Sequence, residues 1–182
     1  MVDVVVENIV VSAQVADEID LDKLSKELPE AQYNPDLFPG LTIRSASPRT
    51  AVILFSNGKA VCTGAKNIGD ARDAVKKVCG MLGGKGFAVN KNPRVTVQNM
   101  VVSTNLKRDI DLGSIADSLK TKVEYEPERF PGLVYRTESS DVVLLVFNSG
   151  RVVGTGGKSK KEMEMALKGL MEEISSIGVI EK

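Results

Sequence analysis

Histidine and tryptophan are absent from the 182 residues, and cysteine occurs only as Cys62 and Cys79. Without histidine the chain lacks the commonest general base and the commonest neutral metal ligand, which excludes a Ser-His-Asp triad and histidine-ligated zinc. The cysteine spacing fits neither a C-x-x-C motif nor a zinc ribbon. We therefore expect two reduced, buried thiols and predict no metal and no cofactor.

A net charge is also absent, because 24 basic residues balance 24 acidic ones. No overall field therefore points to a nucleic-acid or membrane partner. The N-terminus MVDVVVENIVV carries acids rather than the basic region of a signal peptide, and no apolar run approaches the length of a membrane span. These features predict a cytoplasmic protein, with enough hydrophobic residues for one core of ordinary size or two small ones.

The most informative feature present is an internal duplication. FPGLTIR at residues 38–44 recurs as FPGLVYR at 130–136, a shift of 92 residues. A period of this length signals duplication of a domain rather than a solenoid or propeller. Further matches at this shift or one residue less include Phe55 with Phe147, Gly58 with Gly150, Thr63 with Thr155 and Asn8 with Asn99. The sequence predicts two repeats, 1–92 and 93–182, related by a pseudo-twofold axis.

Each repeat has the same expected order of elements. A β-branched run comes first, followed by a short helix, several short strands with Pro-Gly and Asn-Gly or Ser-Gly turns, and a longer helix. This order indicates an α+β fold with an antiparallel sheet. The expected helix N-caps are Asp20, Asn67, Asp111 and Ser159.

The central strands of each repeat, at 51–55 and 142–147, are apolar on both faces. Two helices per repeat can cover only one face of an antiparallel sheet, so an apolar face remains. It could be buried in a dimer, packed on another domain, or kept as a binding surface. Side chains that share a side by period 2 are Ile53 with Phe55, Val61 with Thr63, Asn8 with Val10, Leu145 with Phe147, Val153 with Thr155, and Asn99 with Val101.

The residues that carry the repeat also match a known family. The elements are the two FPGL motifs, Phe55-Ser-Asn-Gly-Lys59 and Cys62-Thr-Gly-Ala-Lys66 with their counterparts at 147–151 and 154–158, and Val97-Gln-Asn-Met-Val101. Over essentially its whole length the chain resembles the TATA-binding protein family in its short archaeal form. The resemblance implies a saddle, in which a curved ten-stranded antiparallel sheet carries four helices on its convex face.

The family's mechanism is implied by this resemblance and not by composition or spacing. Its members place the sheet on the minor groove of TATA-box DNA and bend it with apolar wedges that unstack a base step. The implied wedges are Phe38, Phe55, Phe130 and Phe147. The implied minor-groove contacts are Asn8, Asn99, Thr63, Thr155, Val10, Val61, Val101, Val153, Ile53, Leu145, Pro39 and Pro131.

The resemblance also implies phosphate contacts and protein partners. The phosphate contacts would be Arg44, Arg49, Lys59, Lys66, Gln98, Arg136, Arg151 and Lys158. Glu7 stands where the second repeat has Gln98, and a carboxylate there should weaken DNA binding in that half unless it points away. The acidic residues Glu124, Glu126 and Glu128 are expected to contact transcription factor B, with RNA polymerase recruited indirectly. Without DNA, a weak homodimer through the concave face is expected.

Two other functions remain open from the residues. A duplicated α+β domain could bind a small molecule between its halves, although the missing histidine and the absence of paired carboxylates on the apolar face count against an enzyme. A dimerisation module would instead hide the apolar face permanently. The loop Gly154-Thr-Gly-Gly-Lys-Ser159 looks like a phosphate loop but has Val152 where the P-loop pattern requires glycine.

Overall fold

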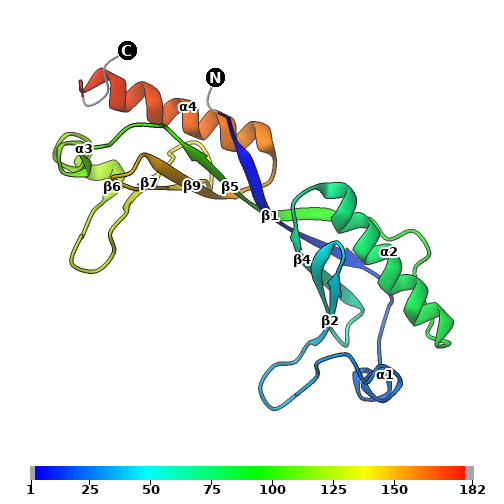
Figure 1. Ribbon diagram of the computed structural model, residues 1–182. Helices are drawn as coiled ribbons and strands as arrows, with labels where there is room; N and C mark the ends of the chain where they lie inside the picture. The colour runs from blue at the N-terminus through cyan, green and yellow to red at the C-terminus, as the bar shows by residue number, and fades with distance from the viewer. Residues whose placement is uncertain (1–2, 179–182) are drawn as a thin grey trace. The chain divides into compact units, whose positions relative to one another are not determined.

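The structure, a computed structural model, describes residues 3–178. The chain forms two compact units, each containing helices packed on strands (Figure 1). One unit comprises Asn8–Gln98, and the other combines residues 3–7 with residues 99–178. The chain thus passes from one unit to the other at the matched residues Asn8 and Asn99, whereas the sequence places the boundary between the repeats after residue 92.

The first unit contains most of strand β1 and two helices that flank a β-meander. Its elements are β1 (Val5–Gln14), α1 (Leu21–Glu27), β2 (Leu41–Ala46), β3 (Arg49–Leu54), β4 (Lys59–Ala65) and α2 (Ile68–Gly84). The second unit repeats this order. Its elements are β5 (Thr96–Asn105), α3 (Leu112–Leu119), a 3₁₀ turn (Lys120–Lys122), β6 (Val123–Glu124), β7 (Leu133–Arg136), β8 (Val143–Val146), β9 (Arg151–Gly157) and α4 (Lys160–Ser176).

Residues 3–178 contain nine strands, in the order β2-β3-β4-β1 in the first unit and β5-β9-β8-β7-β6 in the second, so the α+β class is confirmed and the predicted count of ten is wrong. The missing strand would be the counterpart of β6 in the first unit. At that position the first unit has a single β-bridge, in which the backbones of Gln32 and Thr42 exchange two hydrogen bonds of 2.9 Å. A single bridged residue does not amount to a strand.

The helices begin where the sequence predicts. Asp20, Asn67, Asp111 and Ser159 each accept a hydrogen bond from the backbone N–H three residues later, which satisfies a donor that the first helical turn leaves free. The four predicted caps are therefore confirmed.

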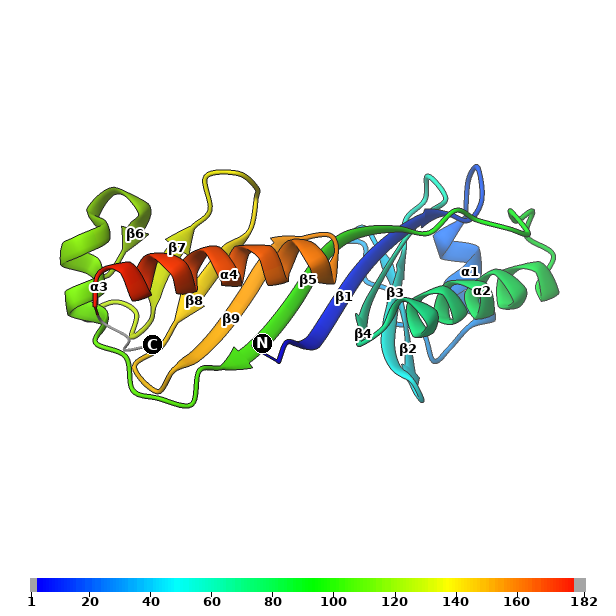
Figure 2. The ribbon, with the colours of Figure 1, turned by 90° about the horizontal axis from the view of Figure 1, so that it is seen from above.

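The longer helix of each unit packs on strands of the same unit. Helix α4 lies across β9 in the second unit (Figure 2), and α2 packs on β3 and β4 in the first.

In each unit, helices cover one face of the strands and leave the other face open. In the first unit Val52, Leu54, Ala60 and Cys62 are buried, at 3% exposure or less. Their alternating neighbours Ile53, Phe55, Val61 and Thr63 are only half-buried. The same alternation separates Leu144 and Val146 from Leu145 and Phe147 in the second unit. This settles which parity faces the helices and confirms an uncovered apolar face in each unit.

Candidate nucleic-acid interface

A row of directly opposite residues crosses the open face of each unit. In the first unit the register aligns Ser12, Val61, Ile53 and Thr42 across four strands. In the second unit the corresponding row is Ser103, Val153, Leu145 and Val134. The rows bring together the predicted valine, isoleucine and leucine contacts. They add Thr42, Val134, Ser12 and Ser103, which the sequence analysis misses although period 2 places them on this face.

A pair of phenylalanine rings lies at the far end of each face. The Phe38 and Phe55 rings meet edge-on with centroids 5.9 Å apart, and Phe130 and Phe147 do the same at 5.9 Å. Phe38 is 46% exposed and Phe130 39%, which is unusual for so large an apolar side chain. Pro39 and Pro131 follow them and are exposed as well. The structure thus joins each predicted wedge to its partner in the same unit.

The glycines of the FPGL motifs let these rings approach. A Cβ on Gly40 would lie 2.6 Å from Cε1 of Phe38 and 3.3 Å from Cε1 of Phe55. A Cβ on Gly132 would lie 2.7 Å from Cε1 of Phe130 and 3.0 Å from Cε1 of Phe147. Distances under 3.0 Å require the Phe38 or Phe130 ring to shift, so an alanine at either position would displace the exposed ring of the pair.

Asn8 and Asn99 each bind a β-bulge. The register between β1 and β4 shifts between Ile9 and Val11, opposite Gly64, whose φ is +93°. Asn8 Oδ1 accepts the Gly64 N–H at 2.7 Å, and Asn8 Nδ2 donates to Thr63 Oγ1 at 3.1 Å. In the second unit Asn99 makes the same bonds to Gly156 and Thr155, at 2.8 and 3.2 Å.

These bonds satisfy the extra backbone donor that the bulge leaves unpaired. They also fix each asparagine side chain with its amide nitrogen beside a threonine hydroxyl. Val10 and Val101, two residues further along the same strands, are half-buried next to these groups. Each unit therefore brings together the predicted asparagine, threonine and valine contacts, and gives each asparagine a structural role as well.

The predicted phosphate contacts are exposed, but their neighbours differ. Lys59 and Arg151 occupy equivalent positions at the start of β4 and β9, after the tight turns. Arg136 Nε lies 3.1 Å from Glu124 Oε1, whereas its counterpart Arg44 donates to neutral Gln32 at 3.3 Å. The remaining predicted cations are Arg49, Lys66 and Lys158, all exposed.

Glu7 and Gln98 make equivalent hydrogen bonds. Ser103 Oγ donates to Glu7 Oε1 at 2.6 Å, and Gln98 Nε2 donates to Ser12 Oγ at 2.8 Å. The Glu7 carboxylate therefore binds a serine hydroxyl of its own unit, as its counterpart amide does. Exchange of amide for carboxylate reverses the direction of the bond but keeps the contact.

The acidic cluster before Phe130 is largely occupied by internal ion pairs. Glu126 pairs with Arg129 at 2.9 Å, and Glu124 pairs with Arg136. Glu128 lies on the exposed turn between Glu126 and Arg129 in the sequence. The turn itself forms because the Arg129 and Phe130 N–H groups donate to the Glu126 carbonyl at 2.9 and 3.0 Å.

The described residues also bear on metal binding, membrane insertion and thiol reactivity. Within residues 3–178 no cluster of three His, Cys, Asp or Glu side chains could hold a metal ion. None of the described helices is both long and apolar enough to cross a membrane. Cys62 and Cys79 are buried free thiols, and burial raises the pKa of Cys62 to about 11 and that of Cys79 in the same direction.

Comparison of the chain with known proteins shows the family to which it belongs. The sequence model described as "Transcription factor TFIID (or TATA-binding protein, TBP)" matches residues 3–84 and 94–177, one match for each repeat. The chain belongs to this family. The TATA-box-binding protein of Archaeoglobus fulgidus is 45% identical over 176 residues, which cover 96% of either chain.

Other relatives give the same result. TATA-box-binding protein B of Halobacterium salinarum is 43% identical over 177 residues, covering 97% of this chain and 95% of the relative. The solved structure of Methanococcus jannaschii TBP superposes with a TM-score of 0.89 at 41% identity, covering 96% of this chain and 99% of that one. The resemblance drawn from the repeated motifs is thereby confirmed.

Proposed function

We propose that the chain is a general transcription factor, without a catalytic step, that binds the minor groove of TATA-box DNA with the open face of each unit. The observation that carries the proposal is the duplicated face itself. Each copy has half-buried aliphatic side chains across its strands, a phenylalanine pair with one exposed ring, and an asparagine-threonine pair. An apolar surface with a few fixed donors suits a groove whose A·T pairs offer only acceptors.

Within this proposal the four phenylalanines unstack DNA. Phe38 and Phe130 supply the exposed edges, and Phe55 and Phe147, which directly follow β3 and β8, support them. Unstacking costs a few kcal/mol per base step, which apolar contacts with the widened groove must offset. The rows that contain Ile53 and Leu145 provide those contacts.

The asparagine amides would read the central base pairs. Each Nδ2 has two hydrogens, of which the neighbouring threonine hydroxyl takes one. The second can be donated to adenine N3 or thymine O2. A guanine amino group would instead meet the valines beside the amide, which favours A·T pairs by exclusion.

The exposed lysines and arginines at the strand ends would contact phosphates and set the salt dependence. Arg136 contributes less in this scheme than Arg151, because Glu124 already offsets its charge. The turn before Phe130 would recruit transcription factor B through its exposed carboxylates, Glu128 among them, and RNA polymerase would follow indirectly. The molecule would act on promoter DNA in the archaeal cytoplasm, at the nucleoid.

The experiment is fluorescence anisotropy with a labelled duplex that contains a TATAAA-like core, against a G·C-substituted duplex of equal length, across a salt series. At least tenfold preference for the A·T core, about 1.4 kcal/mol, is expected. Equal binding of both duplexes at every salt concentration would refute minor-groove readout.

Light scattering without DNA tests the alternative function, a dimerisation module. A tight dimer that DNA leaves intact would mean that the open faces are buried permanently. A weak dimer that DNA dissociates agrees with the proposal.

A further inference from the structure

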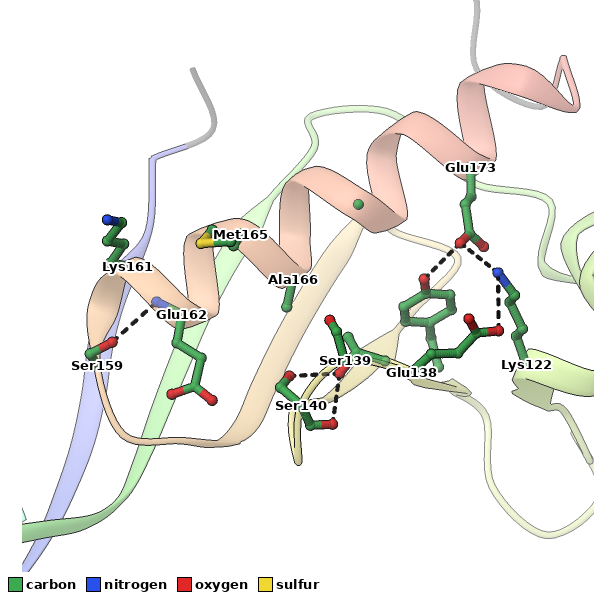
Figure 3. A pocket seen from close by; sticks show the side chains of 13 residues that line it. Lys122, Glu138, Ser139, Ser140, Ser159, Lys161, Glu162, Met165, Ala166 and Glu173 are labelled. Atoms are coloured by element: carbon green, nitrogen blue, oxygen red, sulfur yellow. Dashed lines mark hydrogen bonds and ion pairs between the residues drawn. The ribbon is translucent and has the colours of Figure 1, made fainter.

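A pocket of about 620 Å³ opens on the helix-covered side of the second unit (Figure 3). Helix α4 forms one wall, and strand β7 with the loop after it forms the other. Its lining includes Tyr135, Glu138, Ser140, Met165 and Gly169. Because α4 covers the face opposite the open one, this pocket lies outside the proposed DNA interface of its unit.

A polar network of four residues closes one end of the pocket. Glu173 Oε1 accepts hydrogen bonds from Lys122 Nζ at 3.0 Å and from the Tyr135 hydroxyl at 3.1 Å. Lys122 Nζ also lies 3.4 Å from Glu138 Oε1. Burial and the adjacent Glu173 raise the pKa of Tyr135 to about 12, so the hydroxyl keeps its proton and donates it. The other oxygen, Glu173 Oε2, is buried and has no partner within the described chain.

This network belongs to one repeat only. At the positions equivalent to Lys122, Tyr135 and Glu173 the first unit has Glu30, Ile43 and Met81. Those residues also line a pocket, of about 320 Å³, so the same place in the fold is hollow in both units. The fold thus accounts for a hollow here, but not for a half-buried carboxylate that has one buried oxygen without a partner.

The helical wall is open enough for a side chain to enter. Met165 is 65% exposed, and a Cβ on Gly169 would meet no atom within 4 Å. A long aliphatic stem could therefore lie along α4 between Met165 and Gly169. Its head would reach Glu138 and, after rotation of the soft terminal torsion of the carboxylate, Glu173 Oε2.

The charge of the pocket favours a cation. Glu138, Glu162 and Glu173 line it against Lys122 and Lys161, and Lys122 is already held by two of these carboxylates. An anion has no place at the α4 N-terminus, because Glu162 Oε2 already accepts the Lys158 N–H at 2.9 Å and Ser159 Oγ accepts the Glu162 N–H at 3.2 Å. The unused acceptor and the exposed methionine together suit a side chain with a cationic head on an apolar stem.

We propose that this pocket is a docking site for an arginine side chain of a protein partner, which binds the second unit while its open face remains free. Arginine fits better than lysine because its planar head presents several donors at once, and two carboxylates face the same space. The exposed Met165 would pack against an apolar residue next to that arginine. The first unit, with Ile43 and Met81, would not bind such a residue.

The test uses acetyl-Leu-Arg-amide, with acetyl-Leu-citrulline-amide as the neutral isostere, titrated into the full chain while backbone amide NMR shifts are followed. Saturable shifts at Met165, Gly169 and Glu173 with the arginine peptide, at least tenfold weaker with citrulline, are expected. Gly169→Leu should abolish them by filling the pocket while leaving the Lys122 network intact. The matched control is Gly80→Leu on α2, where a Cβ also meets nothing within 4 Å.

Glu173→Gln provides a second variant, and the arginine peptide should bind it at least fivefold more weakly. Binding of a TATA-containing duplex should be unchanged in Gly169→Leu, which separates this proposal from the proposed function. Equal response to both peptides, a stronger response to inorganic phosphate, or arginine binding that survives Gly169→Leu would each overturn the docking site. Shifts centred on Ile43 and Met81 instead would overturn its restriction to the second unit.

Discussion

Asn99 Oδ1 accepts the backbone N–H of Gly156 at 2.8 Å, and Asn8 makes the same bond to Gly64 at 2.7 Å. One amide thus stabilises the bulge and presents a donor on the open face. Asn99→Ala should cost about 1 kcal/mol of unfolding free energy and should also reduce the preference for A·T over G·C duplexes. Urea unfolding and competition anisotropy measure the two effects. If stability falls while the A·T preference is fully kept, the asparagine has only its structural role.

Gly132→Ala tests the contact between the rings. A Cβ there collides with Phe130, and no positive φ is involved, so any effect comes from ring displacement. DNA bending, followed by energy transfer between dyes at the duplex ends, should decrease together with affinity by about tenfold. Gly80→Ala is the control, because it adds the same methyl group to open space on a helix. Normal bending by Gly132→Ala would mean that the ring geometry does not matter.

Phe130→Ala and Phe147→Ala separate the exposed ring from its support. Phe130 is 39% exposed, so its loss should reduce bending more than folding stability. Phe147 is half-buried and also supports Phe130, so its loss should reduce both. Thermal unfolding and energy transfer on the same two proteins check this order. Full bending by both variants would refute the wedge assignment.

The sequence alone predicts much of this fold because the repeat doubles every local signal. Side-chain chemistry predicts the helix caps Asp20, Asn67, Asp111 and Ser159. The fixed spacing of the repeat predicts that Phe55 and Phe147 occupy equivalent positions. The number of strands does not, because Gln32 pairs at a single bridge where Glu124 belongs to a strand. That difference depends on how many backbone pairs form, and the residue types at these positions do not predict this number.

Ion pairs within the site are also beyond sequence reasoning. Arg44 and Arg136 align perfectly in the repeat, yet Arg136 is paired with a carboxylate and Arg44 with an amide. The bulge bonds of Asn8 and Asn99 are hidden for the same reason, since they depend on a register shift that alternation does not reveal. Contacts of residues close in space but far apart in sequence need coordinates.

This difference between cations gives a salt prediction. Each phosphate contact contributes about 0.9 to the slope of log binding constant against log salt. Arg151→Ala should reduce the slope by about that amount and weaken A·T and G·C duplexes alike. Arg136→Ala should reduce it less, because Glu124 partly neutralises that charge before DNA binds. A loss that is selective for one sequence would contradict the phosphate role of Arg151.

The buried thiol of Cys62 should make the protein labile in alkali. Its pKa is about 11 in the folded chain against 9.0 when exposed, so between these values the unfolded state loses its proton first and stability falls as pH rises. A two-unit shift corresponds to roughly 2–3 kcal/mol, fully present below pH 9 and lost by pH 11. Cys62→Ala should be less stable at pH 8, because it leaves a small cavity, but should lose less stability between pH 9 and 11. Urea unfolding at stepped pH values measures this difference, and parallel pH profiles for the two proteins would show that burial of the thiol does not control it.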